Sequence, residues 1–159
     1  MGVIMSECFF SWDAVTAAAT IIGLGFVATQ LYFLLKQLRL QQYIEYTKRY
    51  QEIALNFPES INEASFLFGD LTKNERDKTM RYMRAYFDLC FEEWHLNNEK
   101  LVDRKFWDIW KGGMEFAFSK PSFQQAWEII QTDSRFGTKF EAFVRNAMKE
   151  SRPLPSATT

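Results

Sequence analysis

Cysteine is scarce in this sequence, with only Cys8 and Cys90 among its 159 residues. Two cysteines do not make a disulfide framework, and these two flank a long apolar segment that would separate them across a membrane. The chain also lacks a Gly-rich phosphate-binding loop, a paired-cysteine metal motif and a Ser-His-Asp arrangement. Its net charge of −1 gives no indication of binding to nucleic acid or to anionic lipid. We therefore expect no cofactor, no metal ion and no nucleic-acid partner.

A long apolar segment covers residues 14–35, where 22 consecutive positions hold no Asp, Glu, Lys or Arg. At about 1.5 Å of rise per residue, a helix of this length extends about 33 Å and can span a hydrocarbon layer of about 30 Å. Trp12 near one end and Tyr32 near the other are typical of membrane–water interfaces. We therefore predict a single transmembrane helix over residues 14–35, with the lipid bilayer as its partner.

Positive charge is distributed unevenly around this segment. All 19 Lys and Arg residues follow it, whereas only Glu7 and Asp13 carry charge before it. The positive-inside rule then predicts an outside N-terminus. We expect a protein of the bacterial cytoplasmic (inner) membrane, with residues 1–13 as a short extracytoplasmic tail, 36–150 as a cytoplasmic helical domain and 151–159 as a disordered tail.

Two other interpretations of the apolar segment compete with the transmembrane helix. A cleaved signal peptide needs a basic N-terminal region and a small-residue cleavage site, but residues 1–13 contain no Lys or Arg and the sequence around Lys36 offers no such site. A buried core helix of a soluble protein is generally shorter than 22 uncharged residues. Membrane insertion is therefore the preferred interpretation.

The remaining chain has the periodicity of helices and no strand pattern. Apolar residues recur at alternating three- and four-residue steps up to Pro58, which predicts one helix of about 46 residues from Trp12 to Phe57. A short helix is expected over residues 58–66. Further helices are predicted to begin after Thr72, after Asp103, at Pro121 and after Gly137. The fold class is thus all-α, with a long N-terminal transmembrane helix that continues into a cytoplasmic helical bundle.

One face of the predicted transmembrane helix is small and polar. Its residues follow a strict heptad pattern: Thr16, Thr20, Gly23, Val27, Gln30, Leu34, Gln37 and Gln41. Small residues let helices approach closely in lipid, and Thr and Gln side chains can hydrogen-bond across the contact. We interpret this heptad stripe as the interface of a homo-oligomer, and the protein as a self-associating, membrane-anchored interaction module with a cytoplasmic protein partner. Alternatively, the stripe lines an oligomeric pore of a defence-type effector that depolarises the membrane, or belongs to a monomeric anchor.

The only histidine lies on a predicted helix, where Asp88, Glu92 and His95 fall at positions i, i+4 and i+7 of one face. Di-metal helix bundles need the Glu-x-x-His motif twice, and only one copy is present here. Helical ribonucleases of the HEPN type need an arginine much closer upstream of the histidine than Arg84. We therefore expect a hydrated or ion-paired stripe at these residues, and an enzyme that uses them is the least favoured function.

Several stretches of the second half resemble a known family. They are Arg81–His95 (RYMRAYFDLCFEEWH), Leu101–Asp103, Phe106–Met114 (FWDIWKGGM) and Pro121–Trp127 (PSFQQAW). Together with the apolar first helix, they resemble small single-pass membrane-anchored helical proteins of bacteria that are classed as a domain of unknown function. In its organisation the chain is also similar to the single-pass accessory protein of RNA-targeting CRISPR systems, a membrane pore formed by a ring of subunits. The first resemblance implies no catalytic residues, and the second implies a pore.

Overall fold

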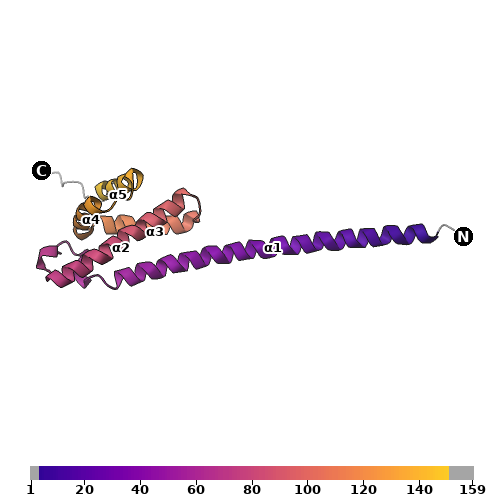
Figure 1. Cartoon of the computed structure of the whole chain (residues 1–159), viewed down its shortest axis with the longest axis horizontal. Coiled ribbons are helices and arrows are strands. Elements are labelled where there is room, and N and C mark those ends of the chain that lie inside the picture. The colour runs from indigo at the N-terminus through magenta and orange to yellow at the C-terminus, as the bar shows by residue number, and fades with distance from the viewer. Residues whose placement is uncertain (1–3, 151–159) are drawn as a thin grey trace, which may run out of the picture. The chain divides into compact units, whose positions relative to one another are not determined.

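The computed structural model describes residues 4–150, and their side chains from Trp12 onward. Five α-helices and two short 3₁₀ helices make up this part of the chain, in which no strand occurs (Figure 1). The prediction of an all-α fold is confirmed. The chain divides into two compact units, residues 1–42 and residues 43–159, and each is described by itself. The tail predicted over residues 151–159 lies outside the described residues.

The first helix, α1 (Ile4–Ala54), differs from the predicted helix at both ends. It begins at Ile4 rather than Trp12, because residues 4–13 contain no proline or glycine that would interrupt it. It ends at Ala54 rather than Phe57, because Pro58 lacks an N–H group and disfavours helical backbone at the residue before it. The two N–H groups before the proline donate to carbonyls three residues earlier, at 3.1 and 3.2 Å, which closes the chain in a tighter turn.

The first unit consists of the apolar part of α1. Its 18-residue apolar window has a mean hydropathy of 1.8, and none of this window is buried. Every side chain from Trp12 to Gln41 is exposed. By length and composition, this is one helix that could cross a membrane.

The second unit begins with the end of α1 and a segment of irregular backbone. The single short helix predicted over residues 58–66 is wrong. Two 3₁₀ helices, η1 (Glu59–Asn62) and η2 (Phe68–Asp70), form instead, because Glu63 and Leu67 between them have extended backbone. Ile61 and Phe68 are buried, so the segment still contributes to the core.

The central helix of the second unit is α2 (Lys73–Asn98). It begins after Thr72, as predicted, and a capping box holds this end: the Thr72 side chain accepts from the Glu75 N–H, and the Glu75 carboxylate accepts from the Thr72 N–H at 2.9 Å. One face of the helix is buried, with Met83 and Phe87 fully enclosed.

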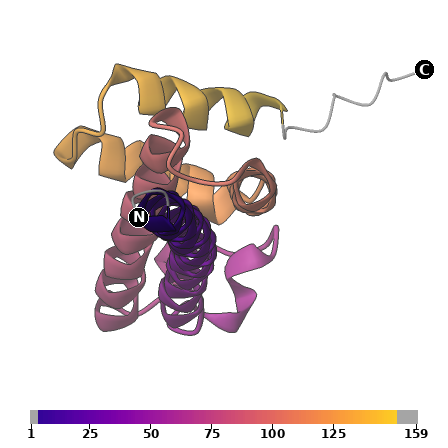
Figure 2. The same ribbon diagram turned by 90° about the vertical axis from the view of Figure 1, so that its right-hand side faces the viewer.

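Three further helices complete the bundle: α3 (Arg104–Phe118), α4 (Pro121–Asp133) and α5 (Thr138–Glu150). Helix α2 packs on α3 and α4, while α5 packs on α3 and runs crosswise to it (Figure 2). Phe87 of α2 stacks on Phe118 of α3 with ring centroids 5.5 Å apart. On the side of α5, Phe140 contacts the rings of Phe91, Trp94 and Trp127. These rings bury apolar surface in the second unit and make ring-to-ring contacts that add to it.

Helix α2 is followed by a lysine whose backbone has a left-handed conformation. Substituting this lysine tests the fold. Lys100 has φ of 58°, and the Lys100 and Leu101 N–H groups donate to the carbonyls of Asn97 and Leu96, which is a Schellman motif. Only glycine adopts this backbone without strain. We expect Lys100→Gly to raise the free energy of unfolding by about 0.5–1 kcal/mol.

This expectation is checked by urea unfolding of the full-length protein in detergent, monitored by tryptophan fluorescence. The control is Lys105→Gly, because Lys105 is an exposed residue within α3 and glycine lowers stability at a helical position. A loss of stability in both variants would show that the ending described for α2 is wrong.

Candidate functional site

Helix α1 places the predicted heptad stripe on an exposed surface of the first unit. All of its members are exposed: Thr16, Thr20, Gly23, Val27, Gln30, Leu34, Gln37 and Gln41. The Thr16 hydroxyl donates to the Trp12 carbonyl, and the Thr20 hydroxyl donates to the Thr16 carbonyl, each at 2.9 Å. These two hydroxyls are therefore satisfied within the helix itself.

Gln30 and Gly23 differ from the threonines of the stripe. Among the residues that the structure describes, the Gln30 amide has no hydrogen-bond partner. A Cβ atom added to Gly23 meets no atom within 4 Å. The stripe thus offers an open surface at Gly23 and an unused amide one heptad later.

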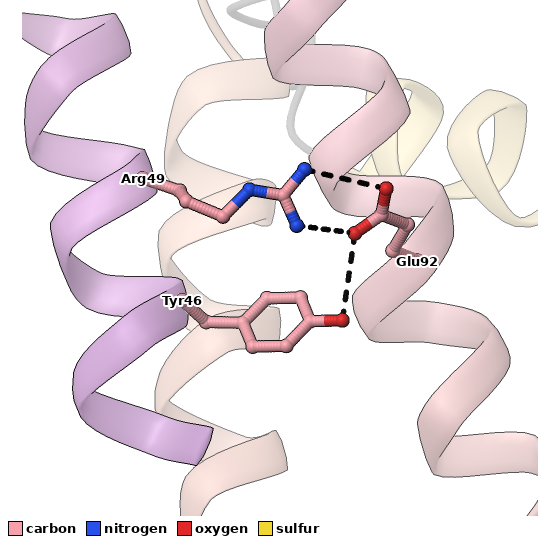
Figure 3. Close-up of polar contacts among 3 residues, drawn as sticks. All are labelled: Tyr46, Arg49 and Glu92. Carbon is pink, nitrogen blue, oxygen red and sulfur yellow. Dashed lines mark hydrogen bonds and ion pairs between the residues drawn. The ribbon is translucent and has the colours of Figure 1, made fainter. Parts of the chain in front are cut away.

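The three residues considered for catalysis do not form a common site. Glu92 faces α1, where its carboxylate pairs with Arg49 at 2.6 Å and accepts from the Tyr46 hydroxyl at 3.4 Å (Figure 3). Asp88 and His95 are exposed. No group of three His, Cys, Asp or Glu side chains in the described part of the chain could hold a metal ion.

The predicted ion-paired character of this α2 face is confirmed at two positions. Besides Glu92 with Arg49, Arg84 pairs with Asp133 of α4. Both pairs are partly exposed, so each contributes at most about 1 kcal/mol. They join helices of the second unit rather than form a reactive centre.

The burial of Glu93, the neighbour of Glu92, was not predicted from the sequence. Glu93 is only 6 % exposed, although carboxylates are rarely buried without a partner. It falls three residues after Cys90 and seven after Tyr86, on the face of α2 that is otherwise apolar. That spacing is the signal that could have identified it.

Glu93 lines a cavity of about 260 Å³ in the second unit, between α2, α3 and the end of α1. The other lining residues are mostly aromatic or aliphatic: Tyr43, Tyr46, Thr47, Tyr50, Tyr86, Leu89, Cys90, Ile109, Trp110, Gly113 and Met114. No fully enclosed side-chain nitrogen or oxygen in the described residues lacks a hydrogen-bond partner. Because Glu93 makes no hydrogen bond to another described residue, its carboxyl oxygens lie against the open space of the cavity.

The cavity strongly changes the acidity of its titratable groups. Burial, and then the nearby charge of Glu92, raise the pKa of Glu93 to about 8. Burial also raises the pKa of the Cys90 thiol and of the Tyr86 hydroxyl. At neutral pH all three groups are therefore mainly uncharged, and Cys90 is not a reactive thiolate.

Comparisons of this chain with protein-family models, with curated proteins and with solved structures find no match. The resemblance to a family of membrane-anchored helical proteins therefore stays a prediction. The most site-like feature of the second unit is the cavity with Glu93, because an apolar pocket with a convergent polar group of shifted pKa is the usual form of a ligand site.

The raised pKa of Glu93 makes stability depend on pH. The folded protein holds this proton up to about pH 8, whereas a free glutamate loses it near 4.5. Between these values the unfolded state binds fewer protons, so the free energy of unfolding falls as pH rises, by up to about 1.4 kcal/mol per pH unit. Glu93→Gln mimics the protonated carboxyl and should remove this contribution.

The measurement is urea unfolding of both proteins in detergent from pH 5 to pH 8, and the quantity of interest is their difference. We expect Glu93→Gln to gain stability over the wild type as pH rises. A constant difference across this range would contradict the buried, protonated carboxyl.

Proposed function

We propose that this protein is a single-pass protein of the bacterial inner membrane, with its N-terminus outside and its helical domain in the cytoplasm. It self-associates through the heptad stripe and presents its domain to a cytoplasmic protein partner. The observation that carries this proposal is the exposure of α1: its apolar window has a mean hydropathy of 1.8, and none of it is buried.

Lipid is the environment that suits this surface best. Exposed apolar area costs about 25 cal/mol per Å² in water, and contiguous apolar patches above a few hundred Å² mark contacts with proteins or membranes. The corresponding helix of a soluble core is mostly buried. A helix that is apolar on most of its circumference is instead typical of a membrane span.

Gly23 and Gln30 support self-association rather than a monomeric anchor. An amide without a partner is unfavourable in a hydrocarbon environment, and the Gln30 side chain has no partner in the described part of its own chain. The same amide on a second copy can supply that partner, for about 0.6–2 kcal/mol. Gly23, one heptad before it, lets the two backbones approach closely.

A depolarising pore is the second candidate, because a ring of subunits would place Gln30, Gln37 and Gln41 around one axis. The hydroxyls of Thr16 and Thr20 are less suited to this role, since they already donate to carbonyls of their own helix. The geometry therefore favours a packed interface over a water-filled lumen. We propose no catalytic role for Asp88, Glu92 or His95.

Gly23→Leu tests the stripe without disturbing the single chain. An added side chain at Gly23 or at Gly25 meets no atom within 4 Å, so neither substitution strains one isolated helix. We expect Gly23→Leu to shift the protein towards monomer by at least about tenfold in association constant, because the close approach of helices is lost. Native mass spectrometry of the full-length protein released from nanodiscs measures the change.

Gly25→Leu is the matched control, because its position lies about 200° around the helix from Gly23. It should leave the assembly intact, while Gln30→Leu should weaken it. A monomeric wild-type protein would contradict self-association. Loss of assembly in Gly25→Leu alone would place the contact on another face and contradict the stripe.

A further inference from the structure

The cavity around Glu93 belongs to the second unit and does not depend on the proposed self-association. Two hydroxyl groups in its wall already donate to partners. The Tyr46 hydroxyl donates to Glu92 at 3.4 Å, and the Thr47 hydroxyl donates to the Tyr43 carbonyl at 2.9 Å. Tyr86 and Cys90 are neutral because burial raises the pKa of both groups. Glu93 carries the only carboxyl among the lining residues.

Aromatic rings form much of the remaining wall. Trp110 lies against Tyr43 and Tyr46, with ring centroids 6.1 and 5.2 Å apart. Tyr50 and Tyr86 form a second group, with centroids 6.3 Å apart. The faces of these rings are negative and attract cations, most strongly at tryptophan.

We propose that this cavity binds the methylated ammonium group of a small organic cation, with the Glu93 carboxylate as its counter-charge and the Tyr and Trp rings as its walls. A buried carboxylate is stabilised by an opposite charge that enters the same space. Aromatic rings solvate the methyl groups of such a cation and attract its charge.

Other ligand classes fit this wall less well. An anion would meet both the carboxyl of Glu93 and the negative ring faces. A primary ammonium carries three N–H donors, whereas the methyl groups of a methylated ammonium match a wall that is mostly aromatic or aliphatic. A volume of about 260 Å³ is below the roughly 300 Å³ at which pockets for drug-sized ligands begin, so the occupant is a small ion or a head group.

The charges around Glu93 allow this assignment. Helix α1 places one cation, Arg49, where its charge acts on Glu93. The Arg49 guanidinium forms an ion pair with the Glu92 carboxylate at 2.6 Å. From α1, the titratable lining groups are tyrosines, and from α2 they are Tyr86 and Cys90, which burial keeps neutral. The lining residues of α3, including Trp110, carry no titratable group. No positive charge thus occupies the cavity.

Cation binding and proton loss are linked at Glu93. The carboxyl is mostly protonated below pH 8, so a permanent cation binds as the proton leaves. The apparent affinity then follows the ionised fraction, which rises about 50-fold between pH 6 and pH 8. A neutral ligand of the same shape has no such dependence.

The test is isothermal titration of choline into the full-length protein, held in nanodiscs of phosphatidylethanolamine and phosphatidylglycerol. The neutral isostere 3,3-dimethyl-1-butanol is titrated in parallel. We expect choline to bind at least about tenfold more tightly than the isostere at pH 8, with the rise in affinity from pH 6 stated above. No binding of choline at millimolar concentration, or equal binding of the isostere, would overturn the proposal.

Two pairs of variants locate the site. Glu93→Gln keeps the shape of the protonated side chain and should bind choline at least about tenfold more weakly at pH 8, without pH dependence. Gly113 lines the cavity and Gly112 does not, so Gly113→Leu should abolish binding while Gly112→Leu leaves it within about twofold. Unchanged binding in Glu93→Gln or Gly113→Leu would overturn the assignment.

A methylated ammonium can come from a free solute or from a lipid head group. Repeating the titration in nanodiscs that contain phosphatidylcholine distinguishes these sources. Competition by the lipid lowers the apparent affinity for choline and identifies a head-group site. An unchanged affinity identifies a site for a free solute. Because the variants above lie in the second unit, a failure here leaves the self-association of α1 untouched.

Discussion

The exposed apolar surface of residues 14–35 is the feature that most strongly constrains the environment of this protein. A helix that carries this much apolar area and is nowhere buried cannot be left in water without a large unfavourable free energy. In the proposed function, insertion into lipid removes that cost, and the positive-inside rule then assigns an orientation from the distribution of Lys and Arg. Insertion also changes the energetics of the polar residues in the stripe. An unpaired amide such as that of Gln30 is tolerated in water but is unfavourable among acyl chains.

In the second unit, two neighbouring glutamates have opposite environments. Glu92 is partly exposed and pairs with Arg49, whereas Glu93, one residue further around α2, is buried without a partner. Arg49 pairs with Glu92 rather than with Glu93. Its charge lowers the pKa of Glu93, but burial and the charge of Glu92 raise that pKa more. A buried, unbonded carboxyl lowers the stability of a fold. Such groups occur mostly where a protein needs them for binding or chemistry, which is why the cavity is the strongest candidate for a ligand site.

The sequence predicted the helices of the second unit closely, because caps and breaks are local. Helix α2 begins after Thr72 and α4 starts at Pro121, both as expected. The segment after Pro58 was mispredicted, since burial of Ile61 and Phe68 depends on packing against distant helices rather than on local propensity. Glu93 was missed for a similar reason: a carboxylate is assigned to the surface by default, and only the packing of α1 and α3 over this face encloses it. The residues of the heptad stripe are all exposed in the single chain, so the sequence could indicate a small and polar face but not what covers it.

Labelling of cysteines from outside the cell tests the central claim of a membrane-spanning α1 most directly. Cys8 precedes the apolar segment, and Cys90 is buried. Replacing Cys90 by serine leaves Cys8 as the single labelling site, at the end of the chain that is proposed to lie outside. A second protein, with Cys8 replaced by serine and the exposed Glu99 by cysteine, reports on the domain. If α1 spans the membrane with its N-terminus outside, a membrane-impermeant maleimide labels Cys8 in intact spheroplasts, and labels the cysteine at position 99 only after permeabilisation. Labelling at position 99 in intact spheroplasts, or recovery of the protein in the soluble fraction, would contradict it.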